Sequence, residues 1–442
     1  MSFGFGLGLP QNYVASLFTP AQLFSTGVQG VWYDPSDMST LFQDSAGTTP
    51  VTAVEQPVGK MLDKSGRGNH ATQATAGNRP TLSARYNLLT KTEQFDDAAW
   101  SKTNASVSVV SGQQKLVENA TSNLHYVSQT PTILATTALF LFQAKAAERK
   151  RVMLRENSVS GAYAIIDLSA ATVIATAGGM SATVTVTSDG WCACAISRNY
   201  TVAGATQFGI FVMPDTATSF ADATYLGDGT SGIYLKNADF RPTNESLNQP
   251  AYQRVNTSTD YDTVGFKPYL SFNGTSSSMA TNSINFSATD KMFVSAGVRK
   301  LSDATTGVIA ELSNSLSGNN GVVSAIAPSG SNLFAWYSKG TVLASALTVD
   351  TAYTAPKTVV MSGIGDIGGT NCTMRLNGAA STNSASQGTG AYGNYPLYIG
   401  ARGGGSLFLN GRLYQLIVSG KAATSTEIVS TELFVNQRTG AY

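Results

Sequence analysis

The stretch Asp63–Thr72 reads DKSGRGNHAT, and Asn78–Leu82, which reads NRPTL, follows it closely. Gly66 and Gly68 can adopt positive φ values at no steric cost, so the first stretch predicts a tight turn. The second stretch passes from a proline into residues suited to a short strand. Upstream, Val31–Tyr33 predicts a preceding strand. These elements indicate the beginning of a β-domain.

Alternation of apolar and polar residues with a period of two runs through most of the remaining chain. Phe140, Phe142, Ala144 and Ala146 alternate with Leu139, Leu141, Gln143 and Lys145, which indicates a strand. The run Thr183–Thr187 alternates strictly, a Ser-Asp-Gly turn follows, and Trp191–Ile196 alternates again, which predicts a hairpin. Predicted strands recur about every ten residues without a long helical pattern, so we expect an all-β fold of antiparallel β-sandwiches.

The motifs in Asp63–Leu82 resemble the opening of laminin-G-like, concanavalin A-like domains. In such domains a strand like Tyr269–Gly274 normally follows within a few residues. Here that strand comes about 190 residues later. The resemblance therefore implies a sandwich that is interrupted by a long insertion.

The beginning of the intervening segment carries a second resemblance. Tyr86–Phe95, continuing to Trp100, resembles the start of a carbohydrate-binding-like jelly-roll module of tailed-bacteriophage virion proteins. The two resemblances together imply one jelly roll inserted into another. We expect the discontinuous laminin-G-like sandwich at residues 29–86 and 257–442, and the inserted jelly roll at residues 87–256.

The two ends of the chain have their own patterns. Residues 1–28 are rich in Gly, Phe and Leu and predict an extended N-terminal arm that docks on a neighbouring subunit, or a tail packed on its own domain. Thr424–Glu427 forms a capping box, and the apolar residues after it fall near helical spacing. With Gly440 as a stop signal, a short C-terminal helix is expected.

Composition excludes several classes of function. Charged residues make up 12% of the chain, about half the usual ~25%. The net charge of +1 provides no basic field for nucleic acid, and no apolar run approaches a membrane span, so we expect neither nucleic-acid binding nor membrane insertion. The cysteines Cys192, Cys194 and Cys372 are too few for a disulfide framework and are expected to be buried.

Catalytic motifs do not stand out. The two histidines, His70 and His125, lie in contexts typical of structural residues, and the run Glu148–Arg151 predicts a solvated turn. Carboxylates are dispersed, whereas glycoside hydrolysis requires a facing pair about 5–10 Å apart. We therefore expect a protein that is not an enzyme.

Loop carboxylates offer a weak calcium hypothesis. Asp34, Asp37 and Asp63 supply oxygen ligands near the expected sandwich rim, where laminin-G-like domains sometimes bind calcium. The alternative is turn and cap duty for all three residues. Apart from this possible calcium, no cofactor is expected.

Aromatic rings beside amide or guanidinium groups are the residues from which a sugar site is built. The glycine-flanked stretch Gly390–Pro396 suits ring stacking. The alternative is that these rings form sandwich core or subunit interface. The candidate carbohydrate-binding residues are Trp336, Tyr337, Tyr392, Asn394, Tyr395 and Arg402.

The resemblances imply a virion structural protein. The first hypothesis is a tail- or head-fibre appendage, commonly a homotrimer, which joins other virion proteins (capsid or tail) through the N-terminal arm and contacts host-surface glycans without catalysis. The second is a capsid decoration, or cement, protein that bridges capsomers. The third, a polysaccharide depolymerase, is disfavoured because the chain lacks a suitable carboxylate pattern.

Overall fold

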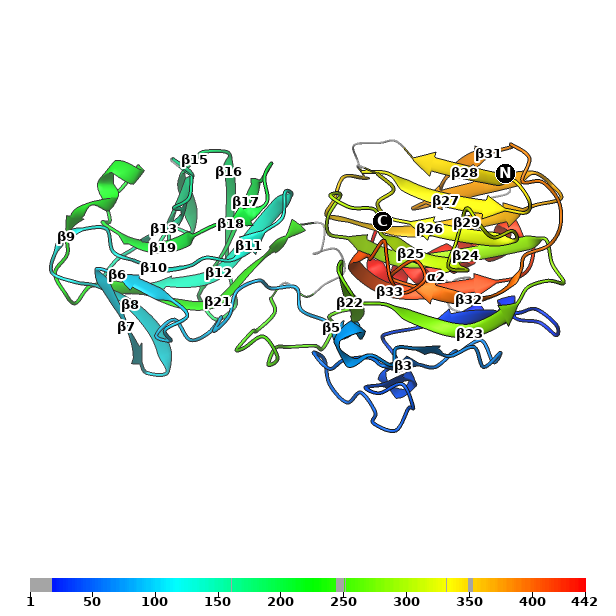
Figure 1. Ribbon diagram of the computed structural model, residues 1–442. Coiled ribbons are helices and arrows are strands. Elements are labelled where there is room, and N and C mark those ends of the chain that lie inside the picture. Colours follow the sequence, from blue (N-terminus) through cyan, green and yellow to red (C-terminus); the bar gives the residue numbers. More distant parts are fainter. Residues whose placement is uncertain (1–17, 160, 244–249, 251, 331, 349–352) are drawn as a thin grey trace, which may run out of the picture. The chain divides into compact units, whose positions relative to one another are not determined.

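The computed structural model describes residues 18–159, 161–243, 250, 252–330, 332–348 and 353–442. The chain divides into two compact units, a split unit of residues 1–84 and 267–442 and an inserted unit of residues 85–266. Figure 1 shows both units built from strands, with helix α2 near the C-terminus. The predicted all-β class with antiparallel sandwiches and a short C-terminal helix is confirmed. The sequence places the boundaries after residues 86 and 256, and the compact units divide after Ala84 and Phe266.

Two sheets pack face to face in the split unit. The first, the β24 sheet, has the order β31-β30-β29-β24-β33-β22-β5, and β1 also pairs with β33. Its strands are β1 (Gly30–Tyr33), β5 (Thr81–Ser83), β22 (Tyr269–Asn273), β24 (Lys291–Lys300), β29 (Lys357–Asp366), β30 (Asn371–Leu376), β31 (Ala379–Asn383) and β33 (Asn410–Ser419). In this sheet Leu270 of β22 lies opposite Leu82 of β5, so the strands on either side of the insertion are direct neighbours.

The second sheet, the β25 sheet, has the order β2-β3-β4-β23-β32-β25-β26-β27-β28. Its strands are β2 (Leu41–Phe42), β3 (Lys60–Met61), β4 (Ala71–Thr72), β23 (Met279–Asn285), β25 (Val308–Leu312), β26 (Val322–Ile326), β27 (Phe334–Lys339), β28 (Leu343–Thr348) and β32 (Asn394–Ile399). Short 3-10 helices join these elements at η1 (Pro20–Leu23), η2 (Met38–Thr40) and η3 (Ala76–Asn78). Alternate residues such as Val294 of β24 and Trp336 of β27 fill the core between the sheets.

The outer face of the β24 sheet is covered. Helix α2 (Ser425–Thr439) begins at the predicted capping box, where Thr424 accepts from Glu427 N, and ends at Gly440 in a left-handed conformation. It lies against β24, β29 and β33 (Figure 1). The apolar residues of this layer come from the helix, the sheet and the N-terminal segment, namely Leu23, Phe24, Phe293, Val360, Ile417 and Val435.

The prediction of an extended N-terminal arm is wrong for residues 18–28. Residues 1–17 lie outside the described residues. From Phe18 onward the segment packs on its own sandwich, because Phe18 stacks edge-on against Phe434 of α2 and Leu23 is buried beneath the helix layer. The alternative of a packed tail holds for residues 18–28.

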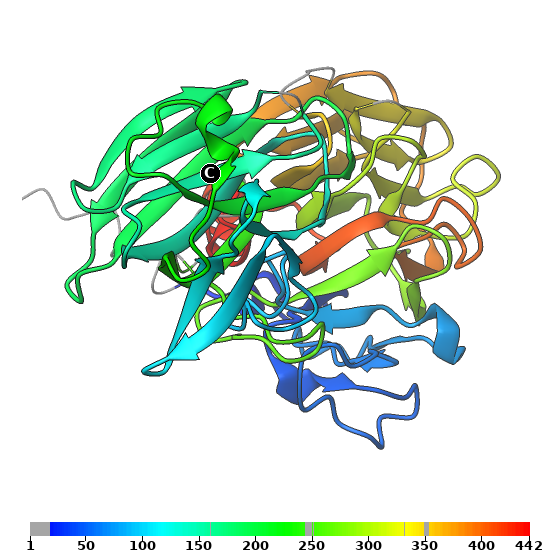
Figure 2. The same cartoon turned by 90° about the vertical axis from the view of Figure 1, so that its left-hand side faces the viewer.

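The inserted unit is a second sandwich, whose twisted strands Figure 2 shows in cyan to green. The β12 sheet has the order β16-β17-β12-β21-β8-β7, and the β13 sheet has the order β15-β14-β13-β19-β10-β6. The β12 sheet contains β7 (Ala105–Val110), β8 (Gln113–Glu118), β12 (Thr137–Ala146), β16 (Met180–Val186), β17 (Cys192–Asn199) and β21 (Gly232–Pro242). The β13 sheet contains β6 (Ser101–Thr103), β10 (Tyr126–Gln129), β13 (Arg151–Glu156), β14 (Tyr163–Asp167), β15 (Thr172–Ala177) and β19 (Phe208–Met213).

Minor elements complete this unit, namely β9 (Ser122–Asn123), β11 (Thr132–Ile133), β18 (Gly204–Ala205), β20 (Tyr225–Leu226) and the 3-10 helix η4 (Phe220–Ala223). Its core is built on clustered rings, with Phe140 and Phe208 5.3 Å apart and Phe208 and Phe240 4.5 Å apart between centroids. The predicted hairpin is present as β16 and β17. All three cysteines are free and buried, as predicted.

A buried polar cluster joins the two ends of the inserted unit. Gln253 Oε1 accepts from the backbone N–H groups of Tyr86 and Asn87, and Asn87 Nδ2 donates to Gln253 O and Ala238 O. Beside them Asp239 on β21 pairs with Arg241 and accepts from Gln253 N. The incoming and outgoing segments are thus fixed to β21 by side chains of the unit itself.

Candidate functional site

The most prominent predicted sugar-stacking rings prove to be core residues. Trp336 has an exposed fraction of 0%, and its Nε1 donates to Ile364 O at 3.1 Å. Tyr392 is 1% exposed, with its hydroxyl 2.7 Å from Ser338 Oγ. Because both rings fill the space between the two sheets of the split unit, neither can stack on an external ligand. The prediction is wrong for these two residues.

The other predicted residues of this group lie apart. Tyr395 packs against the same core from β32, and Asn394 is exposed at the start of that strand. Tyr337 faces the outside of β27 near Arg402. The Arg402 guanidinium donates to both carboxylate oxygens of the buried Glu311 at 2.8 Å, so much of its donor capacity is already used.

The calcium candidates occupy turns. Asp34 Oδ1 accepts from Ser36, and the Lys64 ammonium lies 2.7 Å from Asp37 and 3.6 Å from Asp34. The carboxylate of Asp63 accepts from Trp32 N, Ser65 N and Asn69 N. Across the described residues no group of three or more His, Cys, Asp and Glu side chains is arranged to hold a metal ion. The observed contacts are those of turns and caps, and calcium here stays a prediction.

A different feature, a groove of about 250 Å³, lies on the outer face of the β12 sheet. We name it the outer-face groove; the residues that line it are Leu141, Phe142, Gln143, Thr183, Thr185, Ala193, Cys194, Ala195, Asn237 and Tyr252. None of these described residues carries a charge. Apolar carbons, hydroxyls, amides and a phenol therefore meet in a single depression.

The groove exists because small side chains stand between larger ones. Ala195 of β17 lies opposite Leu141 of β12 and Thr183 of β16. Two residues along, Ala193 lies opposite Gln143 and Thr185 on the same face. Since side chains two apart in a strand point to the same face, the two alanines form a low floor between taller walls.

Tyr252 forms a further wall from outside the sheet. Its hydroxyl lies 2.8 Å from Thr92 Oγ1 and 3.2 Å from Glu93 Oε1, which holds the ring in place. Tyr252 directly precedes Gln253, whose side chain is anchored by the buried polar cluster. The ring is therefore positioned by the same contacts that close the inserted unit.

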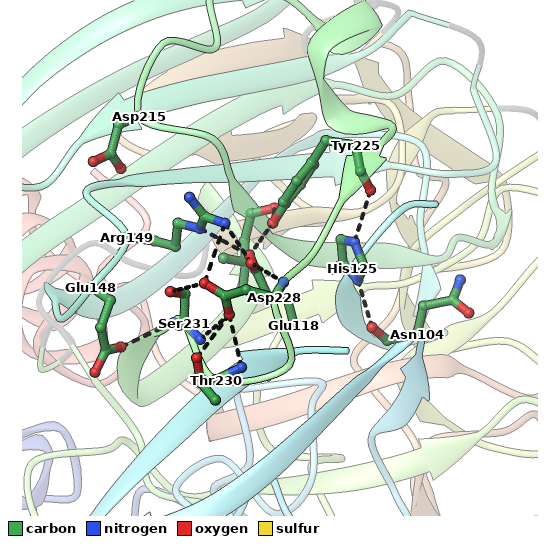
Figure 3. A network of polar contacts seen from close by, with 12 residues as sticks. Asn104, Glu118, His125, Glu148, Arg149, Asp215, Tyr225, Asp228, Thr230 and Ser231 are labelled. Carbon is green, nitrogen blue, oxygen red and sulfur yellow. Dashed lines mark hydrogen bonds and ion pairs between the residues drawn. The ribbon is translucent and has the colours of Figure 1, made fainter. Parts of the chain in front are cut away.

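A second polar arrangement in the inserted unit surrounds the carboxylate of Glu118 (Figure 3). The buried carboxylate of Glu118 accepts from Arg149 Nε at 3.0 Å, from the Tyr225 hydroxyl and from Asp228 N. Arg149 thus bends back into the structure, and the predicted solvated turn at Glu148–Arg151 is wrong for this residue. The network fastens the ends of β8, β12 and β20 together.

The electrostatics of this network oppose acid–base chemistry. Burial raises the pKa of Tyr225, and the neighbouring Glu118 raises it further, so the phenol is held protonated. Burial alone would raise the pKa of Glu118, but the hydrogen bonds from Arg149 and Tyr225 outweigh it and lower that pKa. A general acid would need the opposite shift.

The histidines have structural contacts. His125 is buried beside the network, with Nδ1 2.6 Å from Asn104 O and Nε2 3.3 Å from Tyr225 O (Figure 3). His70 Nδ1 accepts from Asp63 N at 3.0 Å. Both rings therefore make hydrogen bonds with backbone atoms, as expected of structural histidines.

No family model matches the chain, and no curated protein matches it. Matches among solved structures include domains LG4-5 of the mouse laminin alpha1 chain, at 10% identity over 76% of this chain and 94% of that one, with a TM-score of 0.28. Trypanosoma rangeli sialidase in complex with the inhibitor DANA matches at 12% identity over 86% of this chain and 68% of that one, with a TM-score of 0.26. With TM-scores this low, these matches support no conclusion about this chain.

The sequence contains part of the signal for the groove. Strict alternation in Thr183–Val186 and in Cys192–Ala195 shows which side chains share a face, and it places threonines and alanines on the outside. The sequence gives no such signal for Tyr252, because this residue belongs to none of the strands that form the groove. Among the described helices none is long and apolar enough to cross a membrane.

Proposed function

We propose that this chain is a non-catalytic carbohydrate-binding protein whose ligand, a neutral glycan, occupies the outer-face groove. The observation that carries the proposal is the composition of that groove: an alanine floor, threonine hydroxyls, the amides of Gln143 and Asn237, and a fixed tyrosine ring. Sugars present hydroxyls together with apolar C–H faces. A pocket with a few polar groups among apolar and aromatic ones matches that pattern.

The absence of charge among the described lining residues argues for a neutral ligand. An acidic sugar would lose its hydration on entering the groove without gaining a cation in return, which is costly. Lys236 of β21, which lies opposite Gln143, is already paired with Asp189 at 2.6 Å. A non-enzymatic role is part of the proposal because the groove holds no described carboxylate, and glycoside hydrolysis normally uses two.

The virion setting is proposed from the sequence resemblance alone. In that setting the chain is a tail- or head-fibre component that contacts host-surface glycans, and residues 1–17 join it to other virion proteins. A homotrimer would present the groove three times. Linked weak sites gain avidity without any new contact, which suits a shallow groove with modest affinity.

A capsid decoration role is the second candidate, and one observation favours it. Leu343 and Leu347 on the edge strand β28 of the split unit, and Val342 just before it, are exposed. Clustered exposed apolar side chains mark interaction surfaces. A cement protein would bury them against a capsomer, and purified protein would then bind empty capsids and raise their resistance to heat.

The test uses the full chain and a panel of neutral and acidic oligosaccharides. We expect wild-type protein to bind members of the neutral set, and Ala195→Leu, which fills the floor, to weaken binding at least about tenfold, or about 1.4 kcal/mol. Tyr252→Ala should act in the same direction. Ser181→Leu is the matched control, since Ser181 is exposed on β16, on the same face as Thr183 but outside the groove.

The outcomes separate the candidates. Binding by wild type and Ser181→Leu, with loss in Ala195→Leu, supports the groove. Binding that is indifferent to Ala195→Leu and Tyr252→Ala would place the site elsewhere. Capsid binding without any glycan binding would favour decoration, and release of reducing ends from host polysaccharide would reveal a depolymerase.

A further inference from the structure

The groove floor continues into a tryptophan. Ala195, Ala193 and Trp191 are spaced two residues apart, and Trp191 directly precedes β17, so all three face the same side. From Ala195 to Trp191 the strand advances about 13 Å. The indole nevertheless has an exposed fraction of only 5%. It is therefore an aromatic ring on the ligand-facing side of the sheet that is covered.

One group that lies over the indole is a long side chain, that of Lys236. Lys236 Nζ lies 4.3 Å from the centroid of the Trp191 ring and 2.6 Å from Asp189 Oδ2. Lys236 belongs to β21, where it lies opposite Gln143 of the groove. Asp189 belongs to the β16–β17 turn and also accepts from Thr187 Oγ1 at 2.5 Å. The ammonium is thus drawn over the indole by a carboxylate fixed in the adjacent turn.

The cover is weakly held. The Lys236 side chain is 28% exposed and that of Asp189 is 54% exposed. Ion pairs with this much exposure contribute little to stability, because water competes for both charges. Cation–π contacts at exposed positions are weak for the same reason. Displacing Lys236 into solvent leaves both charges hydrated and uncovers an indole face.

We propose that Trp191 is a second stacking platform which extends the outer-face groove, and that Lys236 is a displaceable cover over it. This inference rests on the proposed function and narrows the ligand to a neutral oligosaccharide long enough to reach from Ala195 to Trp191. A short saccharide fills the groove with the cover in place. A longer one displaces the lysine and stacks on the indole.

The first experiment needs no ligand. Acrylamide quenching of tryptophan fluorescence is compared between wild type and Lys236→Ala, each with and without Trp191→Phe to isolate the contribution of Trp191. We expect Lys236→Ala to raise the quenching constant of Trp191 several-fold. An unchanged constant would overturn the inference, since it would show that other atoms bury the indole.

The second experiment measures affinity for two- and six-unit gluco-, manno- and galacto-oligosaccharides. For a sugar that binds, we expect Lys236→Ala to strengthen binding of the six-unit form a few-fold and to leave the two-unit form unchanged. Trp191→Ala should weaken only the six-unit form. Lys150→Ala, which removes an exposed lysine between β12 and β13, is the control for a general charge effect.

The two proposals fail differently. If wild type binds both lengths and Trp191→Ala binds them as wild type does, the platform is wrong while the groove stands. If neither wild type nor Lys236→Ala binds any of these sugars, the proposed function and the platform fall together.

Discussion

The two sandwiches treat the outer face of a sheet in opposite ways. On the β24 sheet, Phe293, Val360 and Ile417 point outward and are buried under helix α2 and the segment from Phe18 to Phe24. On the β12 sheet, the outward positions on and beside β17 are threonines, alanines, an amide and the single leucine Leu141, and a groove remains. Large apolar residues on an outer face require a cover, whereas small and hydroxylated residues do not.

The outer face of the β12 sheet has both a covered part and an open part. At β21 the buried Asp239–Arg241 pair binds Pro250 O and Gln253 N, whereas beside β17 the outer-face groove remains. The groove that we propose as a glycan site lies where the strands are left uncovered. Substitutions on either side of that division test the comparison.

The largest effect is expected at the buried ion pair. Asp239→Ala leaves the Arg241 guanidinium without its partner at a fully buried position and should destabilise the inserted unit by about 3–5 kcal/mol. Chemical denaturation followed by the fluorescence of Trp100 and Trp191 reports on this unit. The double substitution Asp239→Leu with Arg241→Met removes both charges, and it should recover most of the loss.

A matched pair of apolar truncations compares the covered and open faces directly. Ile417→Ala removes a buried side chain beneath α2 and should cost about 2–5 kcal/mol. Leu141→Ala removes a half-buried side chain from the groove and should cost clearly less. Equal losses in urea-unfolding experiments would show that the outer face of the β12 sheet is as tightly packed as the helix-covered one.

Acid should loosen the inserted unit through Glu118. Its pKa in the folded protein lies below the ordinary 4.5, so ionised Glu118 stabilises the fold above about pH 4.5, and this contribution is lost as the pH falls through the lowered value. Glu118→Gln should be less stable than wild type at pH 7, with the difference narrowing below pH 4.5. A difference that stays constant from pH 7 to pH 3 would contradict this assignment.

The smallest effect on stability is expected at the groove floor. Ala195→Leu adds an apolar side chain to an open depression, so its free energy of unfolding should stay within about 0.5 kcal/mol of wild type. The same substitution is expected to weaken glycan binding strongly. Thermal unfolding and binding measured on one preparation would separate the two properties, and a large loss of stability would mean that the groove is closed in solution.

Local sequence patterns predicted the strands well and the site poorly. The hairpin around Ser188–Gly190 and the capping box at Thr424 are local signals, and both elements formed as expected. Exposure is not local. The rings of Trp336 and Tyr392 carry no mark in the sequence that separates a core ring from a stacking ring, because only the pairing of two sheets buries them. Tyr252 and Trp191 enter the proposed glycan site for the same reason. Their contacts are with Thr92 and Lys236, which are distant from them in sequence.

One topological feature bears on how such a chain can change. Ser83 and Tyr269 are paired residues on antiparallel strands of one sheet. Residues 85–266 therefore connect these two strands in the way that the loop of a hairpin does. A loop of that length would ordinarily cost closure entropy, but the bonds from Tyr86 and Asn87 to Gln253 already hold its ends together. The insertion could therefore be replaced as one unit. A tight turn, or a sandwich with a different groove, could be exchanged at the same two positions while the remaining strands keep their register.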